Sequence, residues 1–92
     1  MASVIVTLNI MPVSPDIDIE SIKESALQKI TQHYGETETK TEVEPIAFGL
    51  KAIKVLFVMD ESKGSTEELE RDISTIEGVN SVEVTDVRRA VG

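Results

Sequence analysis

The spacing of hydrophobic residues along this 92-residue chain switches between two repeats, and this switching most constrains the fold. Residues 18–33 place apolar side chains every three or four positions, which predicts an amphipathic helix. Before them, Pro12 and Pro15 mark a loop. Residues 3–11 have one face that is apolar at every second position, which predicts a strand: Val4, Val6, Leu8 and Ile10.

The helix predicted over 18–33 carries signals at both of its ends. Asp16 or Asp18 can cap its first turn, where a carboxylate accepts hydrogen bonds from free backbone N–H groups. Gly35 follows its last turn and predicts where it ends. The stripe that faces the core is Ile19, Ile22, Ala26 and Ile30, widened by Leu27.

Residues 36–44 are almost entirely polar, and two interpretations apply. Their charge density is typical of a disordered acidic linker. Threonine also recurs at every second position, at Thr37, Thr39 and Thr41, which favours a solvent-facing edge strand. We prefer the edge strand, where Pro45 is tolerated.

Residues 50–59 are apolar on both faces, so we expect a central strand that is covered on both sides. One face holds Ile53, Val55, Phe57 and Met59, and the other holds Ala52, Leu56 and Val58.

A second helix and a last strand follow the turn at residues 60–64. Ser65 and Glu68 form a capping-box pattern, in which each side chain bonds to the backbone N–H of the other residue. The helical stripe is Leu69, Ile73 and Ile76, and Gly78 predicts the end of the helix. A strand then runs from Val79 to about Val87.

The predicted order is therefore strand, helix, strand, strand, helix, strand. This order predicts a ferredoxin-like α+β fold, a two-layer βαββαβ sandwich with both helices on one face of a four-stranded antiparallel sheet. Right-handed crossovers place the first and third strands at the centre. We expect residues 1–92 to form a single domain.

Charge and composition exclude several classes of function. The formal net charge is −8, from 17 acidic and 9 basic residues, and an acidic chain is a poor binder of phosphate backbones. RNA-recognition modules of this fold stack bases on central-strand aromatics, but the third strand offers only Phe57. The chain has no cysteine, no basic leader and no apolar run of membrane-spanning length, so we expect a soluble cytoplasmic protein that binds neither nucleic acid nor membrane.

The sequence shows no pattern of catalytic, metal-binding or cofactor-binding residues. It lacks nucleophile, phosphate-loop and dinucleotide motifs. His33 is the only histidine, and we interpret it as structural or surface-exposed. The acidic residues of 36–44 lack the spacing and turn glycine of a calcium loop. We therefore expect no catalytic residue, no metal and no cofactor.

Two surface features remain. Phe48 stands beside Gly49 at the start of the third strand, where it is either an anchor for a partner's pocket or folded under the sheet edge. Arg88 and Arg89 follow the last strand, where they either keep a tail soluble or engage a carboxylate or phosphate on a partner.

Four stretches of the chain, which together span most of its length, resemble the elongation factor 1-beta family. This family includes the archaeal factor and the C-terminal exchange domain of the eukaryotic beta subunit. Each stretch is short, and the order and spacing of the four together carry the resemblance. They are Ile10-Met11-Pro12, Pro45 to Lys51 (PIAFGLK), Gly64 to Leu69 (GSTEEL) and Val82 to Val87 (VEVTDV).

The resemblance implies a guanine nucleotide exchange factor for elongation factor 1-alpha, the GTPase that delivers aminoacyl-tRNA to ribosomes. It implies that Phe48 packs against the GTPase and that Ile46, Gly49 and Lys51 lie in or beside the same contact. Eukaryotic members also disturb the nucleotide's magnesium with a lysine near the C-terminus, where this chain has Gly92.

The departure at the C-terminus leaves two options. Either Arg88 or Arg89 substitutes for the lysine, or the magnesium is disturbed in another way.

Two other functions suit the same fold. One is a regulatory module that binds a small molecule at a strand–helix loop, and the other is a subunit that docks on a GTPase without affecting its nucleotide.

Overall fold

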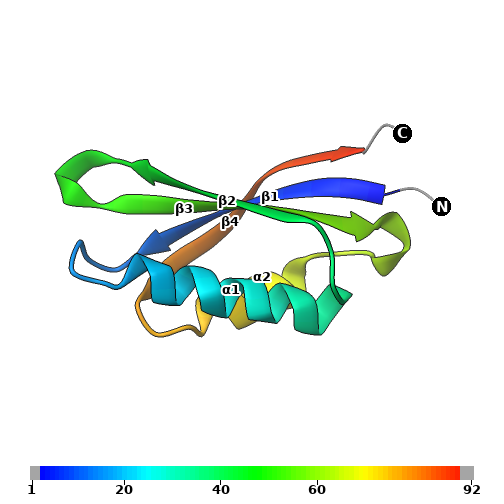
Figure 1. Ribbon diagram of the computed structural model, residues 1–92, viewed down its shortest axis with the longest axis horizontal. Helices are drawn as coiled ribbons and strands as arrows, with labels where there is room; N and C mark the ends of the chain where they lie inside the picture. The colour runs from blue at the N-terminus through cyan, green and yellow to red at the C-terminus, as the bar shows by residue number, and fades with distance from the viewer. Residues whose placement is uncertain (1–2, 90–92) are drawn as a thin grey trace.

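Four strands and two helices follow one another in the predicted order in the computed structural model, which describes residues 3–89 (Figure 1). Short turns of 3₁₀ helix at Ala47–Gly49 and Glu61–Lys63 flank the third strand. The main elements are β1 (Ser3–Pro12), α1 (Ile19–Tyr34), β2 (Thr39–Pro45), β3 (Lys51–Asp60), α2 (Glu67–Ser74) and β4 (Val79–Arg89).

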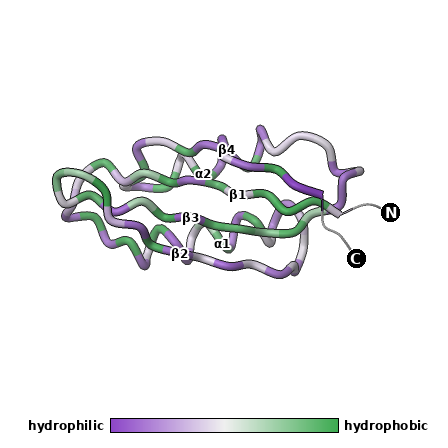
Figure 2. The backbone as a smooth tube through the Cα atoms, turned by 90° about the horizontal axis from the view of Figure 1, so that it is seen from above, coloured by the Kyte–Doolittle hydropathy of each residue, from purple (hydrophilic) through white to green (hydrophobic). Residues whose placement is uncertain are grey.

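The four strands form one antiparallel sheet in the order β2-β3-β1-β4, which Figure 2 shows from above. Both helices cover one face of this sheet (Figure 1). This arrangement confirms the predicted ferredoxin-like α+β sandwich, with β1 and β3 at the centre and β2 and β4 at the edges. Among the described residues, neither helix is both long enough and apolar enough to cross a membrane.

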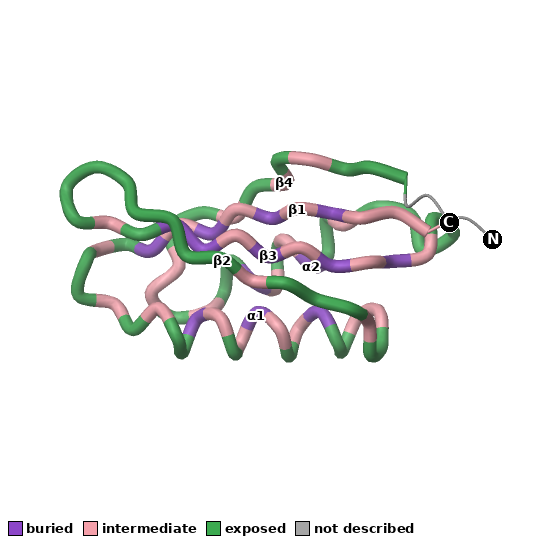
Figure 3. The backbone as a smooth tube through the Cα atoms, turned by 45° about the horizontal axis from the view of Figure 1, so that its top comes forward, coloured by how far each residue is buried: buried purple, intermediate pink, exposed green. Residues whose placement is uncertain are grey.

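The core lies between the sheet and the helices, where buried residues of both layers face one another (Figure 3). Tyr34 closes one end of it and stacks on Phe57, with ring centroids 5.6 Å apart. Each fully buried large apolar side chain contributes about 1.5–3 kcal/mol relative to an exposed one. The sheet contributes Val6, Leu8, Ile10, Ile53, Val55, Phe57 and Met59, and the helices contribute Ile22, Ala26, Ile30, Leu69 and Ile73.

The opposite face of the sheet is not covered by any described element. Leu56 and Val58 lie on it and are only partly buried, although Ala52 is buried. The prediction that β3 is covered on both sides was therefore wrong. Apolar residues are common on exposed sheet faces, so an apolar composition does not show that both faces of a strand are buried.

The boundaries of α1 match the sequence signals. The Asp18 carboxylate accepts hydrogen bonds from the backbone N–H groups of Glu20 and Ser21, at 3.1 and 3.3 Å. Asp18, and not Asp16, is thus the cap, and the helix begins one residue later than predicted. At the other end the Gly35 N–H bonds to the Thr31 carbonyl at 2.8 Å.

The predicted capping box of α2 was wrong. The Ser65 hydroxyl accepts from the Glu67 N–H at 3.0 Å, and not from Glu68, because the helix begins at Glu67. Thr66 is the cap, and its hydroxyl bonds to the Glu70 carboxylate at 3.1 Å. The helix ends at Ser74, well before Gly78.

Both edge strands differ from their predicted bounds. β2 begins three residues later than predicted, and its Thr39 and Thr41 lie opposite the core residues Phe57 and Val55. These threonines therefore lie on the helix side of the edge and not on the open face. β4 continues to Arg89, so both arginines belong to a strand and not to a tail.

Candidate functional site

The loop between β2 and β3 is a tightly closed turn. The Ile46 N–H bonds to the Leu50 carbonyl at 2.8 Å, and the Leu50 N–H bonds back to the Ala47 carbonyl at 3.3 Å. These two bonds close residues 46–50 into a compact loop at one end of the sandwich, at the left in Figure 1. We call residues 46–51 the hairpin tip.

Phe48 is held in an unusual backbone conformation at the centre of the hairpin tip. Its φ is 63° and its ψ is 27°, and Gly49 follows with a φ of 76°. Phe48 is the one non-glycine residue with positive φ among residues 3–89. A left-handed conformation costs an aromatic residue about 1–2 kcal/mol, and such strain concentrates at functional sites.

The same conformation directs the Phe48 side chain into solvent, with 92% of the residue exposed. The alternative that Phe48 folds under the sheet edge was therefore wrong. A ring that is this exposed on a strained backbone adds little to the stability of the fold.

The hairpin tip brings together four of the six predicted site residues. Ile46 is 36% exposed and precedes the turn. Gly49 adopts a left-handed backbone conformation within the turn, which glycine allows without strain. Lys51 is exposed at the first position of β3, opposite Pro45. The result is a protruding aromatic ring with aliphatic and cationic neighbours.

Arg88 and Arg89 lie at the other end of the sandwich. Arg89 lies opposite Val4, near the start of β1. The hairpin tip lies beyond the other end of β1, where Pro12 is eight residues from Val4. At about 3.4 Å per residue this separates them by roughly 27 Å. The predicted site residues therefore form two clusters, and we call the second the arginine pair.

Each side chain of the arginine pair is held by an ion pair within the chain. Arg88 Nε lies 2.7 Å from Asp86 Oδ2, and Arg89 Nη2 lies 3.2 Å from Glu61 Oε1. Both arginine side chains are about three-quarters exposed, so these contacts contribute little and are easily exchanged for others. Gly92, which the resemblance places at the position of the eukaryotic lysine, lies outside the described residues.

His33 has a structural contact far from either cluster in the sequence. Its Nε2 lies 2.6 Å from Asp72 Oδ2 and joins the end of α1 to α2. The hydrogen bond from His33 holds the pKa of Asp72 below its usual range. No group of three His, Asp or Glu side chains within residues 3–89 is arranged to hold a metal ion.

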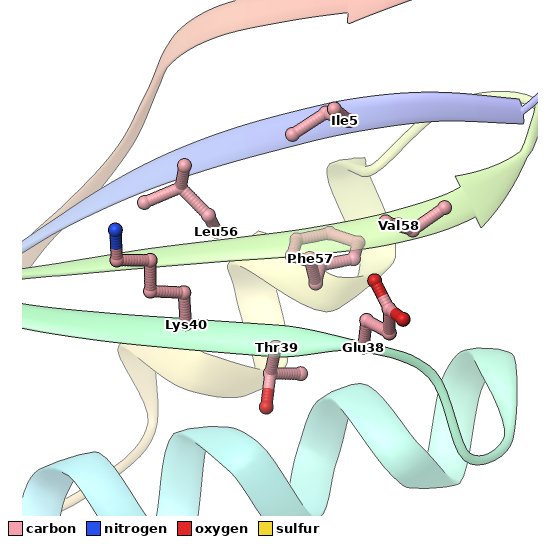
Figure 4. Close-up of a pocket in the computed structure, with 7 residues that line it drawn as sticks. All are labelled: Ile5, Glu38, Thr39, Lys40, Leu56, Phe57 and Val58. Carbon is pink, nitrogen blue, oxygen red and sulfur yellow. The ribbon is translucent and has the colours of Figure 1, made fainter. Parts of the chain in front are cut away.

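A shallow hollow of about 140 Å³ lies on the open face of the sheet (Figure 4). Ile5, Leu56 and Val58 form its apolar floor, and Lys40 lies at its side. Pockets for small molecules measure about 300–1,000 Å³, and the regulatory-module hypothesis needs one at a strand–helix loop. This hollow is smaller and lies mainly over strands.

The fold and the two clusters define a small α+β module with exposed side chains at both ends of its sheet. Comparison of its sequence with known families gives the specific assignment. The model of the EF-1 guanine nucleotide exchange domain matches residues 5–90, and the chain belongs to this family. Its function is accordingly nucleotide exchange in translation elongation.

Relatives named elongation factor 1-beta align over nearly the whole chain. The chain is 45% identical to the protein of Methanothermobacter thermautotrophicus, with 97% of this chain and 98% of the relative covered. It is 42% identical to that of Staphylothermus marinus, with the same coverage. The archaeal resemblance stated from the sequence is thereby confirmed.

Solved structures of other proteins share the fold alone. The de novo designed protein Foldit4 superimposes with a TM-score of 0.67 at 18% identity, and 98% of each chain is covered. The BLUF protein BlrP1 gives a TM-score of 0.56 at 12% identity, with 100% of this chain and 57% of that chain covered. Such low identities carry no information about function.

Proposed function

We propose that this protein accelerates replacement of GDP by GTP on elongation factor 1-alpha, and that Phe48 is its main anchor on that GTPase. The observation that carries the proposal is the strained, 92% exposed Phe48 in a chain of the exchange-domain family. Large aromatic residues that enter a partner's pocket dominate the energy of many interfaces.

The proposed mechanism is differential binding and needs no covalent chemistry from this chain. An exchange factor releases GDP when it binds the nucleotide-free GTPase more tightly than the GDP-bound form. Each tenfold preference corresponds to about 1.4 kcal/mol, so a thousandfold acceleration needs about 4 kcal/mol. One buried aromatic anchor and a few charged contacts supply an amount of this order.

The separation of the two clusters implies that the GTPase is contacted at two places. We assign the apolar contact to the hairpin tip, with Lys51 at its rim, and the polar contact to the arginine pair. Because the ion pairs of Arg88 and Arg89 are exposed, both guanidinium groups can turn toward a carboxylate or phosphate near the nucleotide. The rigid sheet between them fixes the distance.

The proposal extends to the organisation and location of the protein. We propose that residues 1–92 act as a single exchange domain, since the family match spans residues 5–90. We further propose that it acts in the cytoplasm, where elongation takes place.

The test is release of a fluorescent GDP from elongation factor 1-alpha under excess unlabelled nucleotide. We expect clear acceleration by the wild-type protein and at least a tenfold loss of acceleration with Phe48→Ala, whose circular dichroism spectrum should stay unchanged. Binding without acceleration would identify a subunit that only docks. A Phe48→Ala variant as active as wild type would remove Phe48 from its proposed role.

A further inference from the structure

Exposed hydrophobic side chains gather at one end of the molecule. Single exposed apolar residues need no explanation, but a group of them marks an interaction surface. Within residues 3–89, four of the five large exposed hydrophobics lie at or near the hairpin tip, and the fifth, Val87, lies near the arginine pair. The four are Val13, Val43, Ile46 and Phe48.

Val13 belongs to this group although it lies on a different loop. It follows β1 directly and is 56% exposed. The loop that it begins, residues 13–18, reaches the hairpin tip, because a Cβ built on Gly49 lies 3.8 Å from Pro15 Cβ. In Figure 1 both loops lie at the same end of the sheet.

The loop of residues 13–18 is fixed to the rest of the fold. The Val13 N–H bonds to the Gly78 carbonyl at 2.8 Å, just after Pro12 pairs with Val79. Ile17 packs against the core and fills the space beside Gly78 so closely that a Cβ there would lie 2.8 Å from it. Val13 is therefore presented by a rigid support, as Phe48 is by its closed turn.

We propose that Val13 forms one docking surface with Phe48, so that the elongation GTPase contacts both loops at once. This inference rests on the proposed function and names a second apolar contact within it. The matching surface on the GTPase is an apolar depression that takes the phenyl ring, with an aliphatic shoulder against Val13. Two rigidly held contacts lose little conformational freedom on binding, which favours affinity.

A second copy of this chain is a less suitable occupant. The net charge of −8 on each copy opposes close association. The hollow on the open sheet face lies on a different surface from the two loops.

The experiment compares Val13→Ser with Val87→Ser in the same GDP-release assay, over a range of exchange-factor concentrations. Both valines are 56% exposed, so each substitution removes a similar apolar surface, one at either end of the molecule. We expect Val13→Ser to raise the half-saturating concentration about three- to tenfold, corresponding to about 0.7–1.4 kcal/mol. Val87 adjoins the arginine pair, so Val87→Ser should raise the half-saturating concentration less than Val13→Ser does, and both variants should melt like wild type.

The outcomes separate this inference from the proposed function. If Phe48→Ala weakens exchange and Val13→Ser does not, Val13 lies outside the interface and the inference is overturned while the proposed function stands. Equal effects of Val13→Ser and Val87→Ser would also overturn it. So would sedimentation experiments in which the wild type is a dimer and the Val13→Ser variant is a monomer. If the wild type itself fails to accelerate release, the proposed function is wrong whatever Val13 does.

Discussion

The two ends of the sandwich hold their exposed residues by different means. At the hairpin tip, backbone hydrogen bonds and a strained left-handed residue fix an apolar side chain in solvent. At the other end, long charged side chains of β4 rest on exposed ion pairs. The tip is thus shaped before any partner arrives, whereas the arginine pair is free to change its contacts.

The largest expected effect concerns the close packing of Ile17 against Gly78, which supports the loop of residues 13–18 beside the hairpin tip. Gly78→Ala places a Cβ 2.8 Å from Ile17 Cγ2 on a backbone with a φ of 94°, and we expect a loss of about 2–4 kcal/mol in unfolding free energy. Gly64→Ala is the matched control near the arginine pair, since its φ is 79° but nothing lies within 4 Å of its Cβ. Urea unfolding of both variants compares them, and equal losses would show that the contact with Ile17 contributes nothing.

The second prediction concerns the strain at Phe48. Asparagine tolerates the left-handed conformation better than phenylalanine, so we expect Phe48→Asn to stabilise the fold by up to about 1 kcal/mol. The same variant should lose at least tenfold in GDP-release acceleration because the ring is gone. A less stable Phe48→Asn variant would indicate that the phenyl ring stabilises the fold by more than its left-handed backbone destabilises it.

The third prediction concerns the arginine pair. We expect Arg88→Gln with Arg89→Gln to change the unfolding free energy by less than about 0.5 kcal/mol, because both ion pairs are exposed. Acceleration of GDP release should fall several-fold and should become less sensitive to salt. Unchanged exchange at low salt would confine the proposed interface to the hairpin tip.

The sequence was sufficient to predict the fold because several independent signals agreed. Hydrophobic patterns identified both helices and three of the strands, and alternating threonines indicated β2. A polar β2 beside an apolar β3 then indicated which strand lies at the edge. Boundaries were less predictable, since Ser65 and Thr66 both suit a helix cap and only tertiary packing selects between them.

The site was predictable only in part. The exposure of Phe48 was one of two alternatives predicted from its place next to a turn glycine, which is a local signal. Val13 has no such signal, since one valine between two prolines looks like any loop residue until Pro15 is placed beside Gly49. The distance between the two clusters likewise depends on strand register, which a residue-by-residue analysis does not give.

The smallest expected effect lies at the arginine end and concerns acid stability. A hydrogen bond from the Ser62 backbone N–H, 2.9 Å from the Asp60 carboxylate, lowers the pKa of Asp60 from its ordinary value of 3.8. Its stabilising contribution is therefore present above pH 3.8 and is lost as the pH falls through the lower folded-state pKa. Asp60→Asn keeps an acceptor but cannot titrate, so its melting temperature should fall less steeply between pH 5 and about 2.5. Identical slopes would assign the acid sensitivity to other groups, such as Asp72.

The central position of β1 has a consequence for how the protein is made. β1 leaves the ribosome before β4, its partner on one side, and Val4 of β1 pairs with Arg89 of β4. A nascent chain cannot complete this sheet until β4 has emerged, so the edge of β1 that faces β4 keeps its backbone groups unpaired until then. A chain truncated before β4 would keep such an edge permanently and should aggregate.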